Sequence, residues 1–131
     1  MDFSEDASFE KAEILKYMGH IKSGQREYSS AASLYSDSIA IYNSLQNMSE
    51  VANIHINEGL NYFEQNMYEQ AENYYQLALK IATDQEDSQI IADCKHNLGI
   101  LATVRGSFDD AIKYYKQCIE TYENLQSTEQ L

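Results

Sequence analysis

Residues 59–82 read GLNYFEQNMYEQAENYYQLALKIA, and this stretch decides the fold because its pattern recurs forty residues before it and forty residues after it. Proline is absent and glycine occurs five times, so the composition is compatible with long helices. Seven columns keep the register without an insertion: Gly19, Gly59 and Gly99; Ala12, Ala52 and Ala92; Tyr28, Tyr68 and Phe108; Ala31, Ala71 and Ala111; Tyr35, Tyr75 and Tyr115; Ser38, Ala78 and Cys118; Ile39, Leu79 and Ile119. A fixed period of this length is typical of an array of stacked units.

Each unit is predicted to contain two helices. Ala71, Tyr75, Ala78 and Ala82 recur at the three- and four-residue spacing of one helical face. Ser49 and Asp87 or Ser88 are the predicted starts of two first helices, and Gly106 is a predicted helix stop. The pattern predicts first helices over residues 9–22, 49–65 and 88–105, and second helices over 27–46, 68–83 and 108–125. The predicted fold class is therefore all-α, with six helices in three helix-turn-helix hairpins.

The hairpins divide the chain into three units between two short ends. Because one hairpin cannot bury both of its faces, each unit is expected to stack on the next. The predicted divisions are a flexible N-terminal segment at 1–8, unit one at 9–48, unit two at 49–87, unit three at 88–127 and a C-terminal tail at 128–131.

Composition excludes several classes of function. The net charge is −12 and the sequence pI is about 4.4, which argues against binding to nucleic acid or to anionic membrane surfaces. No apolar run is long enough to span a bilayer, and the acidic start does not resemble a signal peptide. Two cysteines do not make a disulfide scaffold at this length, so a reducing, cytoplasmic location is expected.

The third unit resembles a tetratricopeptide repeat through Asn97-Leu98-Gly99, residues 106–111 (GSFDDA) and Tyr115. The resemblance covers about residues 9–126. It implies a right-handed α-solenoid whose first helices line a concave groove, and this groove usually holds an extended peptide. The chain departs from the family in its forty-residue period, in its lack of a closing proline, and in Glu58, which stands where leucine is expected.

The resemblance also implies which residues face the groove. Asn57 and Asn97 share one column, where an amide can both donate to and accept from a peptide backbone; the alternative is ordinary solvated helix polarity. Leu60, Phe63 and Ile100 either receive an apolar side chain or pack between units. The predicted groove residues are Lys16, Tyr17, His20, Asn53, Ile56, Asn57, Leu60, Phe63, Asp93, His96, Asn97 and Ile100.

Charge restricts the expected partner. His20 and Asp93 replace residues that family members with a carboxylate-binding clamp require, and residues 27–79 hold no lysine or arginine. A protein or peptide partner that is neutral, apolar or basic is therefore expected.

No cofactor, metal or catalytic role is expected, because the three histidines lie in different units and no catalytic motif is present. The predicted function is a non-catalytic protein-interaction module. Two alternatives remain: self-association through the apolar faces of the terminal units, and a sensory domain of a larger regulator.

Overall fold

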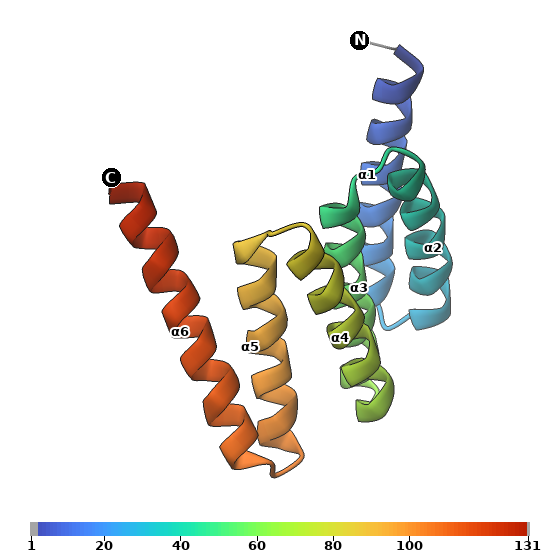
Figure 1. Ribbon diagram of the computed structural model, residues 1–131. Coiled ribbons are helices and arrows are strands. Elements are labelled where there is room, and N and C mark those ends of the chain that lie inside the picture. Colours follow the sequence, from blue (N-terminus) through green and yellow to red (C-terminus); the bar gives the residue numbers. More distant parts are fainter. Residues whose placement is uncertain (1–2, 131) are drawn as a thin grey trace.

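The computed structural model describes residues 3–130, with side chains over residues 4–126. Figure 1 shows a stack of antiparallel hairpins with the two ends of the chain at opposite ends of the array. The helices are α1 (Phe3–Gly24), α2 (Tyr28–Ser44), α3 (Met48–Glu64), α4 (Tyr68–Asp84), α5 (Ser88–Val104) and α6 (Phe108–Gln130). No strand occurs in this described part of the chain. The predicted all-α solenoid of three hairpins and six helices is confirmed.

Both terminal helices are longer than the sequence pattern predicts. Helix α1 begins at Phe3, so residues 3–8 of the segment predicted to be flexible are helical. Glu5 and Asp6 lie in the first turn, where their charges interact favourably with the helix dipole. Helix α6 continues through residues 128–130 of the predicted tail. Residues 1–2 and 131 lie outside the described residues, and the flexibility of the two ends stays a prediction.

All five turns share one backbone conformation. The left-handed residues are Arg26 (φ 63°), Gln46 (φ 58°), Asn66 (φ 62°), Glu86 (φ 53°) and Gly106 (φ 79°), which stand twenty residues apart. After each of them an amide donates to the carbonyl five residues earlier, as Glu27 does to Lys22 at 2.9 Å and Ser107 to Ala102 at 2.8 Å. This is the Schellman termination of a helix. The backbone therefore repeats every twenty residues, half the period of the sequence.

The two predicted helix starts have different outcomes. Asp87 caps α5, and its carboxylate accepts from the amide of Ile90 at 3.2 Å, as predicted. The prediction of Ser49 as a cap was wrong, because α3 begins at Met48 and its N-cap residue is Asn47. The Ser49 hydroxyl instead donates to Asp87 at 3.1 Å and links the first turn of α3 to the N-cap of α5.

Within each hairpin, a glycine lets the two helices approach closely. A Cβ atom built on Gly19, Gly59 or Gly99 would lie 2.5–2.6 Å from a ring atom of Tyr35, Tyr75 or Tyr115, respectively. Ala31, Ala71 and Ala111, one turn before these tyrosines, are buried. The glycine column therefore accommodates the ring, while the alanine column is a second point of close packing.

Candidate binding groove

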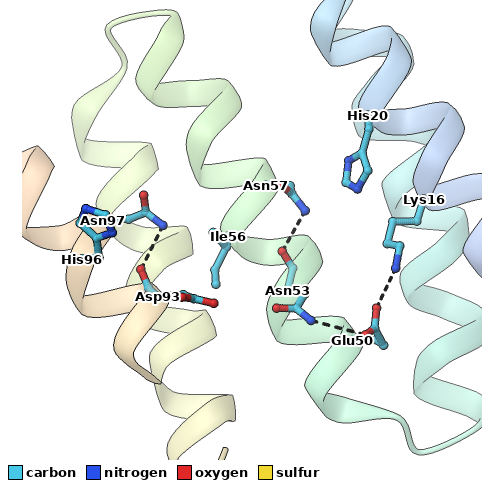
Figure 2. Close-up of a pocket in the computed structure, with 9 residues that line it drawn as sticks. All are labelled: Lys16, His20, Glu50, Asn53, Ile56, Asn57, Asp93, His96 and Asn97. Atoms are coloured by element: carbon cyan, nitrogen blue, oxygen red, sulfur yellow. Dashed lines mark hydrogen bonds and ion pairs between the residues drawn. The ribbon is translucent and has the colours of Figure 1, made fainter. Parts of the chain in front are cut away.

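The first helices α1, α3 and α5 together form a polar hollow of about 350 Å³ (Figure 2). Helix α1 contributes two residues, α3 four and α5 three. The lining residues are Lys16, His20, Glu50, Asn53, Ile56, Asn57, Asp93, His96 and Asn97. Eight of the twelve predicted groove residues therefore lie around one hollow, and Glu50 is an addition to them.

Asn57 and Asn97 are held in the same way, one unit apart. The side-chain amide of Asn57 donates to the carbonyl of Asn53 at 3.1 Å, and that of Asn97 donates to the carbonyl of Asp93 at 3.1 Å (Figure 2). Each bond uses one N–H of the amide and leaves its oxygen and second N–H for other contacts. Because both bonds are formed within a helix, the two amides are oriented before any ligand arrives.

Lys16 is neutralised at one end of the hollow. Its ammonium lies 3.0 Å from Glu50 Oε2 and 3.8 Å from Glu13 Oε1. The second oxygen of Glu50 accepts from Asn53 at 3.4 Å. The ammonium also lies 5.0 Å from the ring centre of Tyr17. Among the described residues that line the hollow, Lys16 is the only lysine or arginine. Its ammonium is paired with two carboxylates.

Asp93 holds a negative charge at the other end. One carboxylate oxygen accepts from Gln89 at 3.2 Å and from the hydroxyl of Tyr122 at 3.4 Å. Glu13 and Glu50 lie beside Lys16, so three carboxylates and one lysine ammonium are found around this hollow. Carboxylates therefore outnumber lysine and arginine side chains around this hollow.

His20 lies on α1 against the tyrosine of its own hairpin. Its Nδ1 is 2.7 Å from the hydroxyl of Tyr35. Burial, and next the nearby Lys16 charge, lower the pKa of His20 below its usual value. Burial raises the pKa of Tyr35 to about 12, so its hydroxyl stays protonated. Both groups are neutral at pH 7 and add no charge to the hollow.

The remaining predicted residues divide into two groups. Leu60 lines a neighbouring hollow of about 330 Å³, which shares His20 and Asn57 with the first. Tyr17, Phe63 and Ile100 line neither hollow. Phe63 packs against Tyr68 of the same hairpin with ring centres 5.5 Å apart and against the buried core, so its role in the groove stays a prediction.

Two residues of these hollows were missed by sequence reasoning. Glu50 is not among the predicted groove residues, yet it is the ion-pair partner of Lys16. Asn61 is buried and accepts a hydrogen bond from Ser23 of α1. The sequence could have indicated Asn61, because the same column holds the apolar residues Ile21 and Leu101 in the other units.

Two kinds of feature are absent from the described residues. No helix among them is both long enough and apolar enough to cross a membrane. The part of the chain with described side chains also contains no group of three or more histidine, cysteine, aspartate or glutamate residues placed to hold a metal ion.

Comparison with known sequences gives one family and one relative. The sequence profile described as tetratricopeptide repeat matches residues 50–124. The transcriptional activator NprA of Geobacillus stearothermophilus is 33% identical over 81 residues, which make up 62% of this chain and 20% of that protein. This chain therefore spans about a fifth of the length of that relative.

Comparison with solved structures concerns the fold alone, because the identities are low. Aspartyl phosphate phosphatase F from Bacillus subtilis gives a TM-score of 0.83 at 21% identity, covering 90% of this chain and 31% of that one. The tetratricopeptide repeat domain of Arabidopsis FLU gives 0.76 at 18% identity, with 89% and 98% covered. The N-terminal domain of stress-induced protein-1 from C. elegans gives 0.71 at 16% identity, with 95% and 96% covered.

Proposed function

Because the chain belongs to the tetratricopeptide repeat family of interaction modules, we propose that it binds an extended segment of a partner protein in the groove between α1, α3 and α5. The proposed role is non-catalytic. The observation that carries it is the matched pair Asn57 and Asn97, whose amides are fixed in the same orientation one unit apart. Such amides do not titrate, and they suit binding rather than proton transfer.

The geometry of an extended peptide supports this proposal. An extended backbone presents unpaired N–H and C=O groups along its length. Each asparagine retains an acceptor oxygen and one N–H, which together can pair with both kinds of backbone group. Two such amides on neighbouring first helices would fix the direction and register of the bound segment without reading its side chains.

The partner segment is proposed to be neutral, apolar or basic. Lys16 is engaged by Glu13 and Glu50, so it is a poor donor for a ligand carboxylate. Asp93 adds a further negative charge at the α5 side. An acidic segment would bring like charges together, whereas a basic side chain would find carboxylate partners. Leu60 in the adjoining hollow supplies an apolar contact.

The test uses peptides selected from a random displayed library on the wild-type protein and measured by calorimetry. Asn57→Ala/Asn97→Ala should weaken their binding at least about tenfold, because two backbone contacts are lost. The matched control is Asn43→Ala/Asn73→Ala, which removes two exposed asparagines from the second helices and should leave affinity unchanged. Equal affinity for the wild type and the groove variant, or preferential selection of acidic peptides, would contradict the proposal.

Self-association is a second candidate, favoured by exposed apolar side chains on α6. Ile112 and Ile119 are 53% and 56% exposed, although they lie in a helix that packs on α5 through its other face. A second copy could cover this face. Light scattering of the wild type should then show a dimer that dissociates in Ile119→Glu. A monomer over the whole micromolar range would contradict this candidate.

A sensory domain of a larger regulator is a third candidate, supported by the relative that is named a transcriptional activator. In this role, peptide binding would change the pitch of the solenoid. Small-angle X-ray scattering with and without a selected peptide should show a changed radius of gyration. A cytoplasmic location is proposed with all three candidates, since Cys94 and Cys118 are unpaired buried thiols.

A further inference from the structure

A third hollow, of about 170 Å³, lies between α2, α3 and α4; it shares no residue with the first hollow and shares only Asn61 with the hollow that holds Leu60. Three tyrosines form much of its wall, and a carboxylate and two amides complete it. We name it the tyrosine crevice, and define it by Tyr28, Tyr62, Tyr74, Glu58, Asn61 and Gln65. Within the described side chains, no lysine or arginine lines it.

The three tyrosine rings line the crevice, and two of them are stacked on each other. Tyr62 and Tyr74 stack with ring centres 5.4 Å apart and an angle of 12° between their planes. Tyr28 comes from the other side, on α2, and its hydroxyl donates to Glu64 at 3.0 Å. The face of an aromatic ring carries partial negative charge and attracts cations.

Glu58 adds a full negative charge at a position that is apolar in the other units. The same column holds Met18 in unit one and the buried Leu98 in unit three. The Glu58 side chain is only 14% exposed, and its Oε1 lies 2.8 Å from Nδ1 of His55. A carboxylate withdrawn this far from water is stabilised by an adjacent cation.

The equivalent crevice one unit later, between α4, α5 and α6, contains an arginine side chain. Five of the six residues that define the tyrosine crevice have their counterpart here forty residues later, and Glu72 is the counterpart of Ala32, which also lines the tyrosine crevice. In this second crevice Arg105 of unit three forms an ion pair with Glu72. In units one and two these columns hold Gln65 and Ala32, which cannot form the pair. The chain thus lines one crevice with its own guanidinium, and the equivalent crevice has none.

We propose that the tyrosine crevice is a second binding site, which receives the guanidinium of an arginine presented by a partner protein. The planar cation would lie against the tyrosine faces and pair with the carboxylate of Glu58, while Asn61 and Gln65 offer amide oxygens to its remaining N–H groups. The site does not depend on the groove, since Asn57, Asn97 and the residues around Lys16 do not contribute to it.

The probe is N-acetyl-arginine methylamide, titrated while NMR follows the ring protons of Tyr28, Tyr62 and Tyr74. Saturable shifts of these signals are expected with a Kd on the order of 1–10 mM, as befits one side chain without its protein. The capped citrulline analogue has the same shape without the charge, and it should give no saturable shifts. Free L-arginine tests the alternative source of the cation, a small metabolite.

Two variants test the assignment of residues. Glu58→Gln should weaken binding of the probe at least about fivefold, because the charged partner is lost. Glu58→Leu copies unit three at this column and should lose binding while the protein stays folded by circular dichroism. Gln65→Arg should place the chain's own guanidinium in the crevice and abolish binding. Gln25→Arg is the matched control, because it changes the same column in unit one, for which the described residues 3–130 include no hairpin before α1.

Several results would overturn the proposal. They are equal shifts with the citrulline analogue, unchanged affinity in Glu58→Gln and in a folded Glu58→Leu, or unchanged affinity in Gln65→Arg. Binding of free L-arginine with no binding of the capped probe would overturn the assignment to a protein side chain. Loss of the selected groove peptides in Asn57→Ala/Asn97→Ala is a separate result, so the two sites can fail independently.

Discussion

Helices α1, α3 and α5 carry apolar residues at the same columns of one face. These side chains are exposed to solvent on α1 and buried on α3 and α5. Ile14 and Ile21 of α1 are 59% and 61% exposed, whereas Ile54 of α3 and Leu101 of α5, at the same two columns, are 0% and 2% exposed. The side chains are similar, and only the presence of a preceding hairpin differs. Burial at these columns is therefore a property of the stack, while contacts inside a hairpin should be alike in every unit.

The largest expected difference comes from shortening the isoleucines at one column. Ile54→Ala should lower the free energy of unfolding by about 2–5 kcal/mol, because it leaves a cavity between units one and two. Ile14→Ala removes the same atoms from a solvent-exposed face and should change stability by less than about 0.5 kcal/mol. Urea denaturation followed by circular dichroism measures both. Similar costs for the two variants would show that α1 is covered in solution.

A glycine substitution should instead cost the same at the end of the array and in its middle. A Cβ at Gly59 would meet the ring of Tyr75 at 2.5 Å, and at Gly19 it would meet Tyr35 at the same distance. Alanine at either position should therefore cost about 1–3 kcal/mol by overpacking the hairpin. Gly24→Ala is the control, since no atom outside its local chain lies within 4 Å of that Cβ. A much smaller cost at Gly19 than at Gly59 would contradict the equivalence of the hairpins.

The distinction between contacts inside a hairpin and contacts between stacked hairpins also explains how much of the fold the sequence could predict. Helix pairing, and the glycine and tyrosine columns, follow from local spacing, so they were accessible before the structure was known. The left-handed turn residues were not, because Arg26, Gln46 and Glu86 are not typical left-handed residues. Their conformation is imposed by the closing of each hairpin rather than by the residue type.

The groove was predictable in outline because its residues share columns on the first helices. Asn57 and Asn97 could be paired from the forty-residue spacing alone. The engagement of Lys16 with Glu50 was not predictable, since the two residues stand 34 positions apart and meet only when α1 and α3 stack. The tyrosine crevice is a further case, because five of its six defining residues come from three helices and Gln65 comes from the turn after α3. Contacts between units therefore cannot be predicted from the residue pattern of a single unit.

Alkaline pH tests a contact made inside the first hairpin. Burial, and next the charge of Glu58, raise the pKa of Tyr35 to about 12, compared with about 10 in the unfolded chain. The neutral phenol is thus favoured by folding, and its contribution is fully present below pH 10. That contribution should be lost as the pH rises from 10 to 12, lowering the free energy of unfolding by about 2 kcal/mol. Urea denaturation of Tyr35→Phe across this interval should show a shallower decline, and an equal decline would contradict the assignment.

The smallest expected effect concerns the turns, which should respond alike wherever they stand in the array. Glu86 has φ 53°, a conformation that glycine adopts without a steric penalty, as Gly106 does at φ 79°. Glu86→Gly should therefore raise the free energy of unfolding by up to about 1 kcal/mol, reduced by the greater freedom that glycine gives the unfolded chain. Gln85→Gly, one residue earlier at φ −86°, has no penalty to relieve and should be destabilising. If both variants change the thermal midpoint in the same direction, the left-handed conformation of Glu86 does not limit the stability of this turn.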